Sequence, residues 1–202
     1  MDNNYKPDFI LTDNHQDWMD KRMNFIGASE IGAVMGLNPF QDAQDIINIK
    51  LGKRPKLFKE DIKRMKDGND KEPEIVKLYE RKTGNKVKLF KDRIFYHPQN
   101  PIFGASLDGY VEKSAGDFVL ECKYSMASFW WNNDTCEYYY PQVQQQMYVM
   151  GVNKADFAVL HPNTLHLKIL TIKRDEEFIK RMLEEGLKFW QLLQNKKANL
   201  LN

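Results

Sequence analysis

Apolar residues recur every three to four positions along several stretches of the chain, and at every second position along others. The helical period predicts helices at residues 14–25, 42–51, 59–82, 126–132, 140–150 and 176–194. The alternating period predicts strands at residues 87–89, 94–96, 102–105, 107–112, 118–124, 155–160 and 165–172. Because helices and strands are interspersed, the order predicts an α/β fold with a mixed central β-sheet flanked by helices.

Two local signals refine this picture. The run Gly27-Ala28-Ser29-Glu30 predicts a tight turn, with Ser29 as the N-cap of a short helix that Gly36 ends. Gly68 and Pro73 predict an interruption of the helix at 59–82, so that Glu72 begins a new helical segment there.

Length and composition are those of a soluble globular protein. The 202 residues predict a single domain spanning 1–202, with 42% hydrophobic residues and a mean hydropathy of −0.63. No apolar run approaches the ~20 residues that a membrane span needs, and the polar N-terminus has no signal-peptide core. Two cysteines cannot form a disulfide framework. We therefore expect a cytoplasmic protein without membrane contact.

Charge is distributed unevenly. The whole chain carries a net charge of +2, yet residues 50–66 contain eight basic and two acidic residues. A basic stretch of this kind is typical of a surface that binds a polyanion such as DNA, and equally of an ordinary solvated helix face.

Two carboxylates and a lysine are predicted to converge. If residues 113–116 form a hairpin loop, Glu112 pairs with Asp117 and Asp108 falls opposite Glu121, with Cβ atoms ~5 Å apart. Lys123 shares the face of Glu121, because strand side chains alternate. An acid at the end of the apolar run 118–120 needs a partner or a metal ion.

These groups suit a hard divalent cation. Mg²⁺ prefers oxygen ligands, which Asp108, Glu121 and the backbone carbonyl of Cys122 supply. Such a cation would polarise a phosphodiester, and Lys123 would offset the charge growing on the phosphate. The same residues also fit a surface Glu-x-Lys pair and an Asp-Gly turn.

Further candidates lie elsewhere in the chain. Glu72 offers a third carboxylate, or an acidic first turn favoured by the helix dipole. Gln144 and Tyr148 are four residues apart and share a helix face, either to bind phosphate and position water or as a polar stripe. The run 129–131 (Phe-Trp-Trp) fits base stacking, a core or a subunit interface.

Five segments together resemble the PD-(D/E)XK nuclease superfamily, and more narrowly the phage lambda exonuclease family of YqaJ-type viral recombinase nucleases. They are, in order, Arg22 with 27–30, Gly68-x-x-x-Glu72-Pro73, Ser106-Leu107-Asp108-Gly109, Glu121-Cys122-Lys123, and Gln144 with Tyr148. Leucine replaces the proline of the family's Ser-Pro-Asp-Gly. The resemblance covers residues 22–160.

The resemblance implies a Mg²⁺-dependent 5′-to-3′ exonuclease, with Mn²⁺ as a substitute, that leaves 3′ single-stranded tails for phage-type recombination. It implies double-stranded DNA ends as substrate, a single-strand annealing protein as partner, a trimeric ring, and the cytoplasm of a bacterial host. The implied metal ligands are Asp108, Glu121, the Cys122 carbonyl and Glu72, the last directly or through water.

The resemblance also distributes the other roles. Lys123 would activate the water, with Gln144 and Tyr148 in support, and Arg22, Ser29 and Ser106 would hold the DNA and its 5′ phosphate. An arginine that follows the family's Glu-x-Lys has no counterpart here, since residues 124–131 contain no basic residue. A structure-selective or nicking endonuclease and a non-catalytic DNA-binding subunit remain the alternative functions.

Overall fold

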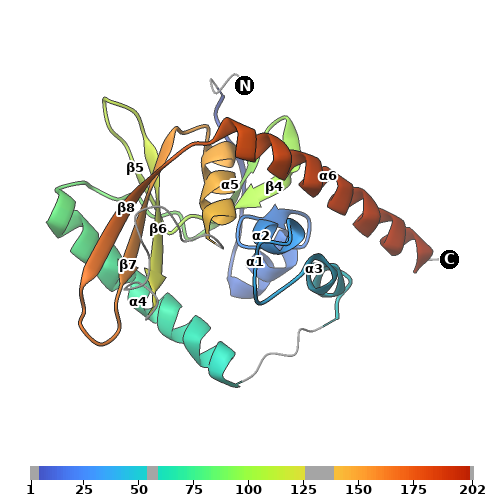
Figure 1. Cartoon of the computed structure of the whole chain (residues 1–202), viewed down its shortest axis with the longest axis horizontal. Coiled ribbons are helices and arrows are strands. Elements are labelled where there is room, and N and C mark those ends of the chain that lie inside the picture. Colours follow the sequence, from blue (N-terminus) through green and yellow to red (C-terminus); the bar gives the residue numbers. More distant parts are fainter. Residues whose placement is uncertain (1–4, 54–58, 126–138, 201–202) are drawn as a thin grey trace.

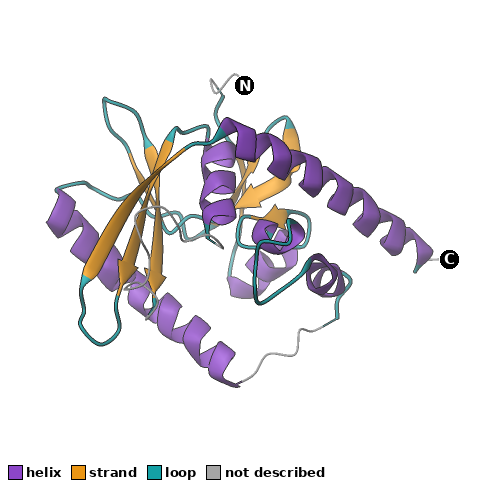
Figure 2. Cartoon of the chain, in the orientation of Figure 1, coloured by secondary structure: helices purple, strands orange, loops and turns teal. Residues whose placement is uncertain are grey.

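The computed structural model describes residues 5–53, 59–125 and 139–200 (Figure 1). In chain order the elements are β1 (Asp8–Leu11), α1 (His15–Arg22), β2 (Ile26–Gly27), α2 (Ile31–Val34), α3 (Ala43–Lys50), α4 (Lys59–Thr83), β3 (Arg93–His97), β4 (Asn100–Ala105), β5 (Gly109–Val111), β6 (Phe118–Tyr124), α5 (Tyr140–Met150), β7 (Lys154–Leu160), β8 (Leu167–Lys173) and α6 (Glu176–Asn199). The α/β class expected from the sequence is confirmed (Figure 2).

The strands form two four-stranded sheets, where the sequence predicted one central sheet. The first sheet has the order β1-β3-β4-β2 and the second β5-β6-β7-β8, and each contains parallel and antiparallel pairs. The division falls at residues 106–108, where the chain leaves β4 and makes no strand pairing before β5 begins. Asp108 therefore lies at the junction of the two sheets.

Strand β6 separates two hydrophobic cores. Leu120 packs in one core with Tyr79 of α4, and Val119 packs in the other with Met147 of α5. Because successive strand side chains point to opposite faces, Glu121 shares the side of Val119, which faces α5. Helices α4 and α5 thus cover opposite faces of the second sheet.

Helix α5 is fastened to the first sheet by a buried amide. Gln145 Nε2 donates to the carbonyls of Ile26 in β2 and Gly104 in β4, at 2.7 and 2.9 Å. The bounds of α5 agree with the prediction, since Pro141 starts the helix and Gly151 ends it in a left-handed conformation. This helix therefore spans both sheets.

Three local expectations are wrong. Helix α4 runs without interruption through Gly68 and Pro73, so Glu72 lies inside a helix and not at its start. The N-cap of α2 is Glu30, not Ser29, and no side chain caps this helix. Residues 87–89 contribute only an isolated antiparallel bridge between Lys88 and Tyr110.

Strands β1 and β2 were missed by the period-two pattern, and the predicted helix at 126–132 lies outside the described residues. Within the described ranges, no helix has the length and apolar character that crossing a bilayer requires.

Candidate active site

The hairpin of β5 and β6 has the predicted register. Gly109 pairs with Leu120 and Val111 with Phe118 in antiparallel fashion. Extending this register by one residue places Asp108 opposite Glu121. The Asp108 carboxylate accepts a hydrogen bond at 2.8 Å from the backbone N–H of Cys122, which fixes it against β6.

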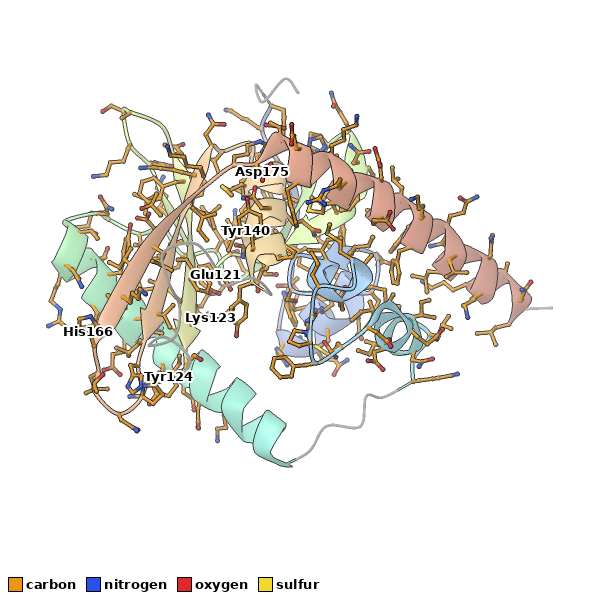
Figure 3. The ribbon with its side chains drawn as sticks, in the orientation of Figure 1. Glu121, Lys123, Tyr124, Tyr140, His166 and Asp175 are labelled. Carbon is orange, nitrogen blue, oxygen red and sulfur yellow. The ribbon has the colours of Figure 1, made fainter. Side chains whose placement is uncertain are left out.

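Glu121 and Lys123 form an ion pair on the face of β6 that looks toward α5 (Figure 3). The Glu121 side chain is only 1% exposed, so its charge depends on protein partners. The Lys123 ammonium also lies over the ring of Tyr139, 5.0 Å from its centroid, in a cation–π contact.

Burial and neighbouring charge shift the pKa values of Asp108 and Lys123. Burial, and after it the neighbouring charge of Glu121, holds the pKa of Asp108 well above its usual range. Burial acts to lower the pKa of Lys123, but the carboxylates of Glu121 and Asp108 outweigh it and raise that pKa above the ordinary value. Lys123 is therefore an ammonium donor at neutral pH, and Asp108 favours a proton or a nearby cation.

Two glutamines of α5 complete the surroundings of Glu121. Gln142 Nε2 donates to Oε1 of Glu121 at 2.5 Å, and Gln146 Nε2 donates to Oε2 at 2.6 Å. Neither glutamine was predicted from the sequence. Residues 143–150 are buried on every side of the helix, so no polar stripe marks the face of α5 that contacts Glu121.

The predicted pair from α5 is not brought to the acids. Gln144 is buried against the start of α6, where its amide donates to the Lys173 carbonyl and accepts from the Asp175 N–H. The Tyr148 hydroxyl accepts from Asn100, and its ring stacks on His97. On a helix these two side chains point away from the face that carries 142 and 146.

Glu72 lies near the two acids without joining them. Burial raises the pKa of Glu72, and the negative charge of Glu121 raises it further, whereas the positive charges of Lys91 and Lys123 act to lower it. Glu72 and Glu121 therefore interact electrostatically. Among the described residues, no three His, Cys, Asp or Glu side chains converge as a metal-binding group.

The predicted phosphate residues Arg22 and Ser106 meet at Trp18. The Arg22 guanidinium lies 4.6 Å from the ring centroid of Trp18, and the Trp18 indole N–H donates to Ser106 Oγ at 2.9 Å. Gln146 Nε2 reaches the Ser106 carbonyl at 3.5 Å as well as Glu121. A chain of contacts therefore connects Arg22 to the carboxylates, whereas Ser29 is exposed in the turn before α2.

The basic stretch 50–66 is not one continuous surface. The Lys50 side chain is 0% exposed and its ammonium lies 2.8 Å from Glu30, so it belongs to the interior. Lys53 and Lys66 are exposed, and the other basic side chains of this stretch lie outside the described residues.

The donor set fits a divalent cation. Asp108 and Glu121 bring carboxylate oxygens close enough to interact electrostatically, and hard cations take oxygen ligands. In addition, Gln146 Oε1 is a buried acceptor that finds no hydrogen-bond donor in the described part of the chain.

Comparisons with known proteins identify relatives of this chain. A family model described as the YqaJ-like viral recombinase domain matches residues 17–153. The uncharacterized protein YqaJ of Bacillus subtilis (strain 168) is 29% identical over 185 residues, which are 88% of this chain and 56% of that protein. The chain thus spans little more than half the length of this curated relative.

Solved structures share the fold. An alkaline exonuclease (LHK-Exo) from Laribacter hongkongensis superposes with a TM-score of 0.74 and 23% identity, over 93% of this chain and 100% of that one. A phage-related exonuclease from Haemophilus somnus 129PT gives a TM-score of 0.65 and 14% identity, over 88% and 96%. The expected PD-(D/E)XK-type fold is confirmed. Because the family match extends over more than half of the chain, this protein belongs to the family of the YqaJ-like viral recombinase domain.

Proposed function

We propose that this protein is a Mg²⁺-dependent deoxyribonuclease that digests linear double-stranded DNA from the 5′ end and leaves 3′ single-stranded tails. The observation that carries the proposal is the convergence of Asp108, Glu121 and Lys123 at the junction of the two sheets. The likeness to exonucleases of known structure supports the same chemistry.

Different residues would bind the metal ion and stabilise the charge on the phosphate. Asp108, Glu121 and the Cys122 carbonyl would hold Mg²⁺, with Mn²⁺ as a substitute, and Glu72 would act through water. When bound, the ion polarises a phosphodiester and makes water a stronger nucleophile. Lys123 keeps its proton, because Glu121 and Asp108 raise its pKa, and its ammonium offsets charge that develops on the phosphate.

Glutamines 142 and 146 orient Glu121. Their donated hydrogen bonds fix the rotation of the carboxylate, so that the lone pair left on Oε2 would be available to a bound ion. We assign to these two residues the supporting role that the sequence had suggested for Gln144 and Tyr148.

The proximity of Arg22 and Ser106 to the carboxylates supports action at a DNA end. A guanidinium can bind a terminal phosphate in bidentate fashion while the adjacent phosphodiester reaches Asp108. Ser29 would contribute from the neighbouring turn. Phosphate contacts carry no base information, so we propose low sequence specificity.

The same resemblance suggests the setting in which the enzyme acts. We propose that it works in phage-type recombination in the bacterial cytoplasm, as a homo-oligomer such as a trimeric ring, with a single-strand annealing protein. One nuclease domain spanning residues 1–202 would carry the activity.

An end-labelling experiment tests the proposed activity. Linear duplexes labelled at either the 5′ or the 3′ terminus, with or without a 5′ phosphate, are incubated with the protein at several Mg²⁺ concentrations beside covalently closed circular DNA. We expect the 5′ label to leave first and the circle to survive. Cleavage of the circle would assign an endonuclease instead, and absence of cleavage with retained binding would assign a DNA-binding subunit.

A further inference from the structure

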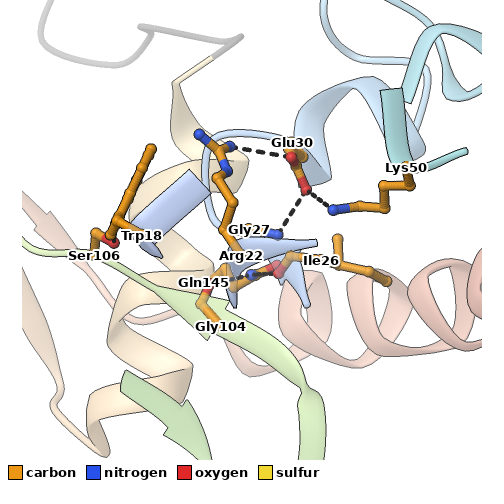
Figure 4. A network of polar contacts seen from close by, with 9 residues as sticks. All are labelled: Trp18, Arg22, Ile26, Gly27, Glu30, Lys50, Gly104, Ser106 and Gln145. Atoms are coloured by element: carbon orange, nitrogen blue, oxygen red, sulfur yellow. Dashed lines mark hydrogen bonds and ion pairs between the residues drawn. The ribbon is translucent and has the colours of Figure 1, made fainter. Parts of the chain in front are cut away.

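Glu30 lies at the centre of a partly buried ion cluster outside the carboxylate site (Figure 4). Its Oε2 lies 2.8 Å from Lys50 Nζ and accepts the Gly27 N–H at 2.9 Å, and its Oε1 accepts from Arg22 Nη2 at 3.0 Å. The exposed fractions of the side chains are 0% for Lys50, 9% for Glu30 and 22% for Arg22. The cluster therefore runs from the interior at Lys50 to the surface at Arg22.

Stability alone does not account for this arrangement. Burial lowers the pKa of Lys50, and the neighbouring Glu30 offsets part of that effect. Desolvation of such a pair opposes its burial, and apolar residues of similar volume often give equal stability. A buried ammonium at the end of α3 therefore suggests a role for its charge.

The charges of Glu30 and Lys50 also determine how strongly Arg22 can attract an anionic ligand. With Glu30 alone, the carboxylate would neutralise the guanidinium, and an approaching phosphate would be repelled by Glu30. With Lys50 present, the three charges sum to +1, and Glu30 serves as a fixed anchor rather than a competitor.

The geometry of Arg22 is defined on two sides. Glu30 holds one terminal nitrogen, and the guanidinium lies over the ring of Trp18. The described part of the chain gives the Arg22 side chain no other hydrogen bond, so its remaining N–H groups are available as donors. Arginine loses less conformational freedom on binding when its guanidinium is already fixed in place.

We propose that Lys50 and Glu30 are positioning residues: Lys50 fixes Glu30, and Glu30 holds the Arg22 guanidinium in the orientation that binds a terminal DNA phosphate. This inference rests on the proposed function only in taking Arg22 as the phosphate contact. It does not depend on cleavage, and binding can therefore test it separately.

The test measures binding in EDTA, where no metal-dependent cleavage occurs. Fluorescence anisotropy gives the Kd of a labelled duplex bearing a 5′ phosphate and of the same duplex bearing a 5′ hydroxyl. We expect the unmodified protein to prefer the phosphate end. Lys50→Met should reduce this preference by about tenfold, with affinity for the hydroxyl end unchanged.

Two further variants separate positioning from charge and from folding. Lys53→Met removes an exposed charge from the same segment and should leave the preference unchanged. The double variant Glu30→Gln/Lys50→Met keeps the net charge of the cluster at +1 and leaves no buried charge unpaired, so it should fold. It should nevertheless lose the preference, because Arg22 has lost its charged anchor.

Each outcome is decisive for the proposal. Wild-type preference in the double variant, or equal losses in Lys50→Met and Lys53→Met, would mean that only total charge matters and would overturn the positioning role. Absence of any phosphate preference in the unmodified protein would overturn it too. Cleavage of linear DNA by the unmodified protein is scored separately, so the nuclease proposal can succeed or fail on its own.

Discussion

Gln146 donates a hydrogen bond across 2.6 Å to Glu121, from α5 to the middle of β6. Gln142 and Lys123 donate to the other carboxylate oxygen, so both oxygens of Glu121 are held. Because the carboxylate is almost fully buried, these donors determine the direction in which it points. Helix α5 is therefore part of the site and not only its support.

The two faces of α5 predict opposite effects of mutation. Gln146→Leu should lower kcat by roughly 10- to 100-fold, because Glu121 loses a donor that fixes its orientation. Gln144→Leu should leave kcat nearly unchanged but reduce the free energy of unfolding by about 1–3 kcal/mol, since the Lys173 carbonyl and the Asp175 N–H lose their partner. Steady-state kinetics and urea unfolding of both variants distinguish the two effects. A larger loss of kcat in Gln144→Leu would reverse our assignment.

Asp108→Asn should remove metal-dependent cleavage while leaving the fold intact. The asparagine oxygen can still accept the Cys122 N–H, but the negative charge beside Glu121 is gone. We expect a rate reduction of at least about 100-fold, since a cation stabilises the transition state by several kcal/mol. The measurement is nuclease activity over a Mg²⁺ titration, with DNA binding measured in EDTA.

Glu112→Gln is the matched control for that experiment. Glu112 lies on the same hairpin, is 52% exposed and forms an ion pair with Lys88 at its surface. Its neutralisation should change activity and stability little, because exposed ion pairs contribute about 0–1 kcal/mol. Equal loss of activity in both variants would point to hairpin structure rather than to a metal site.

Gly109 directly follows Asp108 and packs closely against Val87 and Leu120, so a change in this packing should move Asp108. A Cβ atom at residue 109 would lie 2.5 Å from Val87 Cγ1 and 3.3 Å from Leu120. Gly109→Ala should therefore push β5 away from Val87, shift Asp108, and lower both stability and activity. Val87→Ala in the same chain removes the closest atom and should restore much of the activity. Thermal unfolding and nuclease assays of the single and double variants test this, and an additive loss would contradict it.

The sequence predicted most of what depends on local signals. The hairpin register followed from the length of the loop between Glu112 and Asp117, because antiparallel pairing is fixed once the turn is placed. Pro141 and Gly151 defined the bounds of α5 for a similar reason. Both sets of signals lie within a few residues of the feature that they determine.

Relationships between distant segments could not be read in this way. The spacing of Gln144 and Tyr148 is the same as that of Gln142 and Gln146, and only the packing of α5 decides which pair faces Glu121. Likewise the charge of Lys50 was grouped with its basic neighbours, although Glu30 holds it in the interior. Tertiary contacts, and not residue type, separate these alternatives.

His97 predicts how stability depends on pH. Burial, followed by the nearby charge of Arg174, lowers the pKa of His97 from 6.5 to about 4. Its ring stacks on Tyr148 at 4.3 Å, and Nδ1 accepts the backbone N–H groups of Gln99 and Asn100. The folded protein thus keeps the imidazole neutral at a pH where the unfolded chain already binds a proton.

The consequence is a loss of stability in acid that His97→Asn should reduce. The contribution is fully present above pH 6.5 and is lost as the pH falls from 6.5 to 4, by on the order of 3 kcal/mol. Asparagine retains an acceptor for the two N–H groups but cannot bind the proton. Urea unfolding between pH 4 and 7 should therefore give a flatter profile for His97→Asn than for wild type, although its stability at pH 7 is lower. His166→Asn, at an exposed position, should follow the wild-type profile, and parallel profiles for all three proteins would show that His97 is not the group responsible.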